Sequence, residues 1–294
     1  DWPVFSQPRA LFLGGNTGSK ETVIQFIDVT TTGNASDFGD LTAGRASLMS
    51  ASSKIRAVAA GGNTGSAVNV IDYVTIASEG NASDFGDLSS TSQEGTGTGS
   101  STRGLFQLGL ATDNVNTIEY VTIASTGNAT DFGDRTTTAA YGQDSAISSP
   151  TRGVFSGGFI SNSVNIIDYV TIASTGDATD FGDTSVTRYG MGGASSATRG
   201  VFGGGNTSGD TMDYITIAST GNASDFGNLT NSPRYISGTS NGVRGVFGGG
   251  KVSSTRQDVI QYITIASTGN ATDFGNLIAS NFSLTATSGS HGGI

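Results

Sequence analysis

The side chains that most often carry catalysis are scarce in this chain. It has no cysteine, and its only histidine, His291, stands in a Gly/Ser-rich segment close to the end of the sequence. A Ser-His-Asp or Cys-His arrangement needs an imidazole that the fold holds in place, and we do not expect this segment to hold one. A thiolate zinc site is excluded by the same composition. These residue types therefore predict no catalytic residue, no cofactor and no metal site.

Carboxylates are more abundant, with 24 Asp and Glu residues. A pair of carboxylates can hydrolyse a glycosidic bond, so a carbohydrate-active protein stays open as an alternative. Most of the acids, however, recur at equivalent places of a repeated sequence, which is typical of a structural role. We predict that the chain is not an enzyme.

One repeated group of oxygen-bearing residues could bind calcium. Asn34, Asp37 and Asp40 stand three residues apart and have equivalents in every repeat, and such oxygens are calcium ligands. Alternatively, these side chains accept hydrogen bonds from nearby backbone and shape a turn. Asp40 becomes Asn228 and Asn276 in two repeats, which lowers the ligand charge. We favour the turn.

Three sequence markers recur six times in phase. The tripeptide Asp-Phe-Gly begins at Asp37, Asp84, Asp131, Asp180, Asp225 and Asp273. An arginine that precedes hydrophobic residues stands at Arg9, Arg56, Arg103, Arg152, Arg199 and Arg244. The aromatic residue of the segment typified by "DYVTIAST" is Phe26, Tyr73, Tyr120, Tyr169, Tyr214 and Tyr262. A repeat of about 47 residues is typical of stacked or radial repeat folds.

Each repeat predicts four short strands. In one repeat, strand B is Arg199–Gly205, strand C is Met212–Thr220 and strand D lies in Ala223–Leu229. Strand A precedes the next arginine, as in Tyr235–Val243. Aromatic and β-branched residues fill strand C, and glycines end strand B, as expected of strands and their turns.

Strand A is unusually rich in small residues, as in "MGGASSAT" at Met191–Thr198 and "TGTGSS" at Thr96–Ser101. Six such strands can converge on one axis only if their side chains are small. We therefore predict an all-β fold, a single six-bladed β-propeller of four-stranded blades over residues 1–294, with 1–8 as an N-terminal extension.

The ring is predicted to close through the C-terminal strand. We expect Phe282–Ser290 to lie beside Arg9–Gly15 and to complete the first blade, which removes the exposed edges. Asp1–Pro8 competes for the same position, but Pro3 and Pro8 have no backbone N–H to donate.

The repeats resemble kelch repeats. The resemblance lies in a double glycine after a hydrophobic strand, a tyrosine in the next strand and an aromatic residue near the end of the repeat. The chain differs where kelch repeats usually have tryptophan, because it has phenylalanine in Asp-Phe-Gly. The string "YVTIASTGNATDFGD" at Tyr120–Asp134 is similar to kelch-type repeats in structural proteins of tailed bacteriophages. This resemblance implies a protein of a virion surface or a tail appendage.

The two faces of such a propeller differ in sequence. The repeat face carries the A–B and C–D turns, which are nearly identical, as in "SATRG" at Ser196–Gly200 and "STGNATDFG" at Ser125–Gly133. The loop face carries the B–C and D–A loops, which vary, as in Gly250–Asp258 and Leu229–Tyr235. The six arginines lie on the repeat face, where they could bind an anion. We favour pairing with an acid such as Asp37 or its equivalents.

Specific contacts require variation, so we place the binding site on the loop face. Its candidate ligand-binding residues are Tyr141, Arg188, Tyr189, Arg234 and Tyr235. Aromatic side chains beside arginines suit a sugar or a protein hot spot. Alternatively, these aromatic residues only fill the wide end of strand A.

Charge and hydropathy restrict the partners. The formal net charge of −10 repels phosphate backbones, so we expect no nucleic-acid partner. No run of 18 apolar residues occurs, so we expect no membrane insertion. We predict a non-enzymatic recognition or structural propeller on a virion surface or in an extracellular location, with a host glycan or another virion or surface protein as partner. The alternative is a secreted or cell-surface propeller of bacterial origin that binds or acts on carbohydrate.

Overall fold

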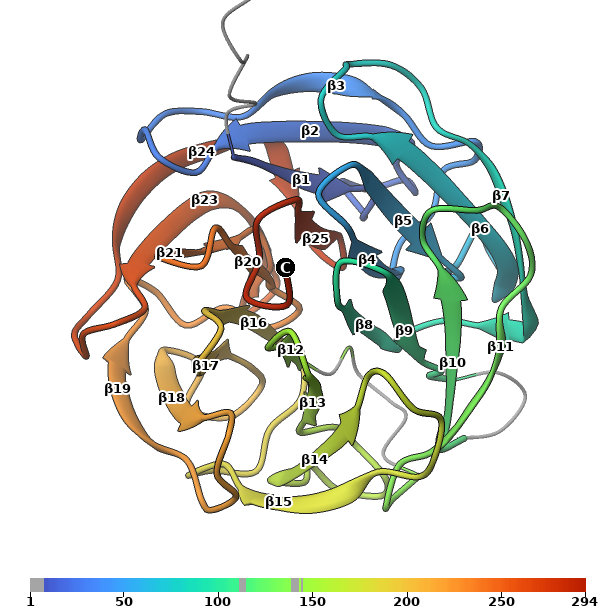
Figure 1. Cartoon of the computed structure of the whole chain (residues 1–294). Coiled ribbons are helices and arrows are strands. Elements are labelled where there is room, and N and C mark those ends of the chain that lie inside the picture. Colours follow the sequence, from blue (N-terminus) through green and yellow to red (C-terminus); the bar gives the residue numbers. More distant parts are fainter. Residues whose placement is uncertain (1–7, 111–114, 139–142, 144) are drawn as a thin grey trace, which may run out of the picture.

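The computed structural model describes residues 8–110, 115–138, 143 and 145–294. Six antiparallel sheets, each the blade of a propeller, surround a central axis (Figure 1), and the described residues contain no helix. The predicted fold is confirmed. In every blade the A strand is innermost and the D strand outermost.

The strands have the following bounds. Blade 1 contains β25 (Thr285–Ser288), β1 (Arg9–Leu13), β2 (Val23–Asp28) and β3 (Ser36–Asp40). Blade 2 contains β4 (Met49–Ser52), β5 (Arg56–Ala60), β6 (Val68–Thr75) and β7 (Ser83–Ser92). Blade 3 contains β8 (Thr96–Gly99), β9 (Arg103–Gln107), β10 (Thr117–Thr122) and β11 (Thr130–Asp134). Blade 4 contains β12 (Ser145–Ser148), β13 (Arg152–Ser156), β14 (Ile166–Thr171) and β15 (Thr179–Asp183). Blade 5 contains β16 (Met191–Ser195), β17 (Arg199–Gly204), β18 (Thr211–Thr216) and β19 (Ser224–Asn228). Blade 6 contains β20 (Ser237–Ser240), β21 (Arg244–Gly248), β23 (Thr255–Thr264) and β24 (Thr272–Asn281), and the short β22 (Lys251–Val252) pairs with β23.

The C-terminal strand closes the ring, as predicted. β25 pairs antiparallel with β1, with Ala10 opposite Ser288 and Leu13 opposite Thr285. Blade 1 is therefore built from both ends of the described chain (Figure 1). Because β25 covers the inner edge of β1, that edge cannot pair with a strand of another chain.

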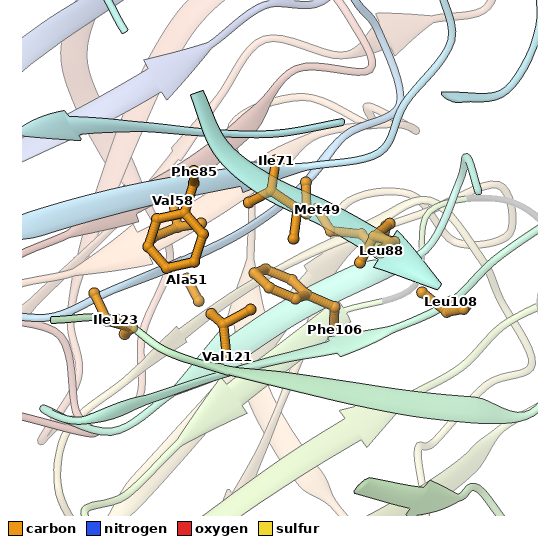
Figure 2. Packing of buried hydrophobic residues seen from close by; sticks show 11 residues of the cluster. Met49, Ala51, Val58, Ile71, Phe85, Leu88, Phe106, Leu108, Val121 and Ile123 are labelled. Carbon is orange, nitrogen blue, oxygen red and sulfur yellow. The ribbon is translucent and has the colours of Figure 1, made fainter. Parts of the chain in front are cut away.

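The hydrophobic core lies between blades rather than in one central mass. Each of six buried clusters joins residues of two neighbouring blades. Figure 2 shows one of them, in which Val58 and Phe85 of blade 2 pack with Phe106 and Val121 of blade 3. The phenylalanine of each Asp-Phe-Gly is buried in such a cluster, so burial in the core explains the second position of the tripeptide.

The inner strands are small-sided because they approach one another closely around the axis. A Cβ atom on Gly97 would lie 2.4 Å from the Ser50 carbonyl oxygen of the neighbouring blade. Serine hydroxyls bridge other inner strands: Ser240 Oγ donates to the Ser195 carbonyl at 2.6 Å, and Ser195 Oγ donates to the Ser148 carbonyl at 2.9 Å. Small polar side chains thus serve as links between blades.

Candidate functional site

On the repeat face, the six arginines connect neighbouring blades. Arg103 is typical: its guanidinium lies 4.7 Å from the centre of the Tyr120 ring in its own blade, and Nη1 donates to the Ile172 carbonyl of the next blade at 2.9 Å. The corresponding bonds join Arg9 to Ile76, Arg56 to Ile123, Arg152 to Ile217, Arg199 to Ile265 and Arg244 to Val29. A cation over an aromatic face is attracted by the ring quadrupole. The ring of its own blade therefore stabilises each arginine in the position from which it donates to the next blade.

The expected pairing of these arginines with Asp37 or its equivalents is wrong. Among the described residues, only Arg9 of the six forms an ion pair, with Glu79 at 3.0 Å. The aspartates of the Asp-Phe-Gly units lie exposed on the outer strands. The arginines instead satisfy the carbonyls that follow strand C of the next blade, and this role requires one arginine per blade.

The glycine of each Asp-Phe-Gly unit and the residue after it also hold neighbouring blades together. In blade 4, a Cβ on Gly182 would lie 2.6 Å from the Gly221 carbonyl of blade 5. The Gly221 N–H donates to the Phe181 carbonyl at 2.7 Å, and Asn222 Oδ1 accepts from the Asp183 N–H at 3.1 Å. Only glycine permits this approach, which explains the third position of the tripeptide.

An equivalent side-chain hydrogen bond joins every pair of neighbouring blades around the ring. Its acceptors are Asn34, Asn81, Asn128, Asp177, Asn222 and Asn270. Asp177 replaces asparagine without loss because the bond needs only an acceptor oxygen. In the described part of the chain, no three His, Asp or Glu side chains gather as they would around a metal ion. The contacts therefore favour the turn role over calcium binding for the Asn34, Asp37 and Asp40 group.

A further repeated position was missed at the sequence level. The residue before the strand C aromatic is polar and buried in every blade: Gln25, Asp72, Glu119, Asp168, Asp213 and Gln261. Each accepts hydrogen bonds from the D–A loop that enters its blade; Asp213, for example, accepts from Ser185 N and Oγ. A polar residue recurring beside the aromatic marker was the available signal.

Arg188 belongs to this buried layer and not to a ligand site. Its side chain is fully buried, and Nη2 lies 2.7 Å from Asp213 Oδ2. Burial lowers the pKa of the Arg188 guanidinium from its usual value, and the charge of Asp213 opposes that shift. Arg45 with Asp72 and Arg135 with Asp168 form the same kind of pair. The guanidinium of Arg188 thus cannot reach a ligand at the surface, so the sequence-based assignment is corrected for this residue.

The D–A loops meet at the axis in a closed ring of hydrogen bonds. Six residues that precede the inner strands take part: Ser47, Glu94, Gln143, Gly190, Tyr235 and Ser283. Each N–H donates to the carbonyl of the preceding member, with N–O distances from 2.7 to 3.2 Å. Every member has φ between 54° and 75°, a left-handed conformation that is uncommon outside glycine. The ring fixes the loop-face ends of the inner strands.

Two of the predicted residues, Tyr189 and Tyr235, lie at this ring in a row of four half-buried aromatic side chains. The ring centres of Phe159 and Tyr189 are 5.5 Å apart, those of Tyr189 and Tyr235 are 5.9 Å apart, and those of Tyr235 and Phe282 are 6.3 Å apart. Burial, followed by a hydrogen bond with Tyr189, raises the pKa of the Tyr235 hydroxyl, so it stays neutral near pH 7. Tyr141 lies outside the described residues.

Arg234, the remaining predicted residue, stands beside two cations that sequence analysis did not single out. Its backbone bridges to Lys251, and Lys251 in turn pairs with Arg256 across the β22–β23 hairpin. Lys251 Nζ lies 3.6 Å from the centre of the Phe282 ring, and the Arg234 guanidinium lies 5.5 Å from that of Tyr235. The cations and the aromatic row therefore form one patch on the loop face.

His291 is held in place at the axis, contrary to expectation. The final residues fold back into the middle of the ring (Figure 1). His291 Nε2 lies 3.1 Å from the Ser52 carbonyl, and Nδ1 accepts from the Gly293 N–H at 3.0 Å. Burial lowers the pKa of the imidazole, and the bond to Ser52 raises it by less. The small inner strands leave room for this segment, which makes His291 part of the packing at the axis.

No family model matches the chain, and a search of curated proteins finds no relative with significant sequence similarity. Within the described ranges, no helix has the length and apolar character needed to cross a membrane.

Proposed function

We propose that this propeller is a non-enzymatic recognition module of a virion surface or tail appendage, and that it contacts a host glycan or another virion protein through its loop face. The aromatic row of Phe159, Tyr189, Tyr235 and Phe282 carries this proposal. Partly exposed aromatic side chains with polar tips are enriched where proteins bind sugars and other proteins.

The contrast between the two faces supports the position of the site. The repeat face uses its arginines and turn asparagines to join neighbouring blades, in all six blades. Among the described residues, the aromatic row occupies one part of the loop face, and its members come from blades 4, 5, 6 and 1 and the loops between them. A one-sided patch on a symmetric scaffold suits a specific partner.

The non-enzymatic part of the proposal is supported by the use of the buried acids. Asp72, Asp168 and Asp213 each neutralise an arginine inside a blade. The virion part is supported by the resemblance of Tyr120–Asp134 to kelch-type repeats of tailed bacteriophages.

The test compares binding of the labelled full chain to immobilised glycans and to virions with that of a Tyr189→Ala variant. Removing one central aromatic side chain should weaken binding about 30-fold, the effect of a hot spot of about 2 kcal/mol. Arg199→Ala is the control, because it lowers stability on the opposite face without touching the patch. If Tyr189→Ala binds as tightly as the wild type, the aromatic row is only packing and the proposed site is wrong.

A further inference from the structure

Arg234, Lys251 and Arg256 place three positive charges in a row across neighbouring chain segments. Lys251 is the direct backbone partner of Arg234 on one side and of Arg256 on the other. Like charges directly opposite each other destabilise paired strands. Lys251 and Arg256 stand on β22–β23, the hairpin extension that only blade 6 shows among the described residues, and Arg234 lies beside it in the preceding D–A loop. The backbone pairing thus brings three positive charges together, with no acid among their pairing partners.

The row is unusual when all 14 lysines and arginines are considered. Six arginines link blades on the repeat face, and three more are buried in pairs with aspartate. Of the five that remain, three form the row, and the others are Lys20 and Lys54. In a chain with a net charge of −10, most free positive charge is therefore collected in one place.

None of the three side chains forms an ion pair or donates a hydrogen bond within the described ranges. Asp258 is close to Arg256 in sequence but does not pair with it. The buried Nε of Arg234 also has no acceptor. A buried donor without a partner is costly, so the described chain leaves this guanidinium incompletely satisfied.

Aromatic rings hold the cations in position. Phe282 lies under Lys251 and within 5.9 Å of the Arg256 guanidinium, while Tyr235 lies near Arg234. Burial, then the charges of Arg256 and Arg234, lower the pKa of the Lys251 ammonium. Both facts describe cations that are already oriented and that repel one another, and a bound anion would relieve this repulsion.

Beside the cations runs a surface groove with polar walls. Arg234 and Lys251 form one part of it, and Asn206, Ser232 and Ser254 contribute amide and hydroxyl groups. Such groups suit the hydroxyls of a sugar, whereas a protein partner needs an apolar interface core. Among the described residues, the well-exposed large hydrophobic side chains near the loop face are Ile160, in a B–C loop, and Ile278, in the part of β24 that leads into a D–A loop.

We propose that the row of Arg234, Lys251 and Arg256, with its groove, binds the carboxylate or phosphate group of an acidic saccharide. This inference rests on the proposed function and specifies its ligand class. Guanidinium and ammonium groups bind both anions through charge-assisted hydrogen bonds. The groove walls contact the sugar hydroxyls, and the aromatic row adjoins the sugar rings.

The experiment uses the full chain and an array that pairs each uronic-acid-bearing or phosphorylated saccharide with the same saccharide lacking the acid. The wild type should prefer the acidic members, and this preference should fall as salt rises. The relative signals of carboxylated and phosphorylated members identify the anion.

Two variants with equal change of charge complete the test on the best acidic saccharide. Lys251→Gln should weaken binding roughly tenfold, the effect of losing one hydrogen bond to a charged group. Lys54→Gln, on the repeat face, should bind as the wild type does. Both lysines are partly or fully exposed, so neither variant is expected to unfold, and equal melting temperatures verify this.

The outcomes separate the two proposals. If acidic and neutral saccharides bind equally, the proposal of an acidic ligand is wrong. The same holds if Lys251→Gln binds normally while Tyr189→Ala binds weakly, and in that case the loop-face site is retained. If both variants bind normally, both proposals are wrong. Preference for an immobilised polyglutamate over every acidic saccharide would overturn the saccharide and indicate an acidic protein.

Discussion

Arginines lie over aromatic rings on both faces of this propeller, but the six arginines of the repeat face and the exposed Arg256 of the loop face differ in their hydrogen bonds. On the repeat face, Arg199 lies 4.5 Å from the centre of the Tyr214 ring and donates to the carbonyls of Ile265 and Ala266 in the next blade. On the loop face, Arg256 lies near the Phe282 ring and donates to no group of the described chain.

The difference separates arginines that hold blades together from cations that are available to the proposed ligand. Each blade presents equivalent carbonyls to the blade before it, and one arginine of that preceding blade donates hydrogen bonds to them. The donors of these six arginines are therefore used within the chain. The loop face has no such repeated partner near β22–β23. Lys251 and Arg256 of this hairpin donate to no acceptor of the described chain, as the proposed ligand site requires.

The largest effect should come from breaking the close approach of two blades on the repeat face. Gly182→Ala would place a Cβ 2.6 Å from the Gly221 carbonyl, and we expect a loss of about 3 kcal/mol or more in unfolding free energy. Gly221→Ala has a similar φ, but its Cβ would meet nothing within 4 Å, so backbone strain alone should cost about 1–2 kcal/mol. Denaturant unfolding measures both. Equal losses would mean that backbone strain, and not the contact between blades, requires glycine at position 182.

A smaller effect on the unfolding free energy should distinguish an arginine of the repeat face from one of the loop face. Arg199→Ala loses a cation–π contact and two hydrogen bonds to carbonyls, so we expect a loss of about 2 kcal/mol. Arg256→Ala should change the unfolding free energy by no more than about 0.5 kcal/mol, because its side chain is exposed and donates no hydrogen bond within the described chain. Thermal unfolding of the two variants provides the comparison. A larger loss in Arg256→Ala would show that the cation row stabilises the fold, which contradicts a role reserved for a ligand.

The smallest effect concerns the axis between the faces. The pKa of His291 is lowered in the folded protein from about 6.5, so the unfolded chain binds the proton more tightly. The stability contributed by His291 should be present above about pH 6.5 and lost as pH falls through the folded-state pKa. Protonation would also convert Nδ1 from an acceptor of the Gly293 N–H into a donor.

The unfolding free energies of the wild type and His291→Ala should therefore differ by about 1 kcal/mol at pH 7.5, the value of one buried hydrogen bond. The gap should narrow toward pH 5. Because the carboxylates are common to both proteins, the difference isolates the imidazole. A gap that stays constant over this range would mean that His291 contributes packing alone.

Much of the architecture followed from the sequence because it depends on periodicity. Three markers in phase predicted six blades, the small residues of strand A predicted convergence on an axis, and the prolines near the start favoured closure by β25. The markers and the small residues are local properties that recur in each repeat. The sequence also separated an invariant face from a variable one.

Partners that lie in another blade required the tertiary structure. The acceptor of Arg103 is 69 residues further along the chain, and it is a backbone carbonyl, which no side-chain pattern can reveal. Arg188 lies two residues before Gly190 of the hydrogen-bonded ring and is buried against Asp213, whereas Arg234 lies one residue before Tyr235 of the same ring and is only partly buried.

The proposed patch of aromatic and cationic residues could be predicted only in part for the same reason. Arg234 and Tyr235 are adjacent in sequence, whereas Tyr189 and Phe282 belong to other repeats and reach Tyr235 because the D–A loops of successive blades meet at the axis. Repetition in the sequence determined what each blade is, because each blade repeats the same local rules. Closure of the ring decided which side chains of different blades meet, because that depends on packing distances between segments that the chain itself keeps far apart.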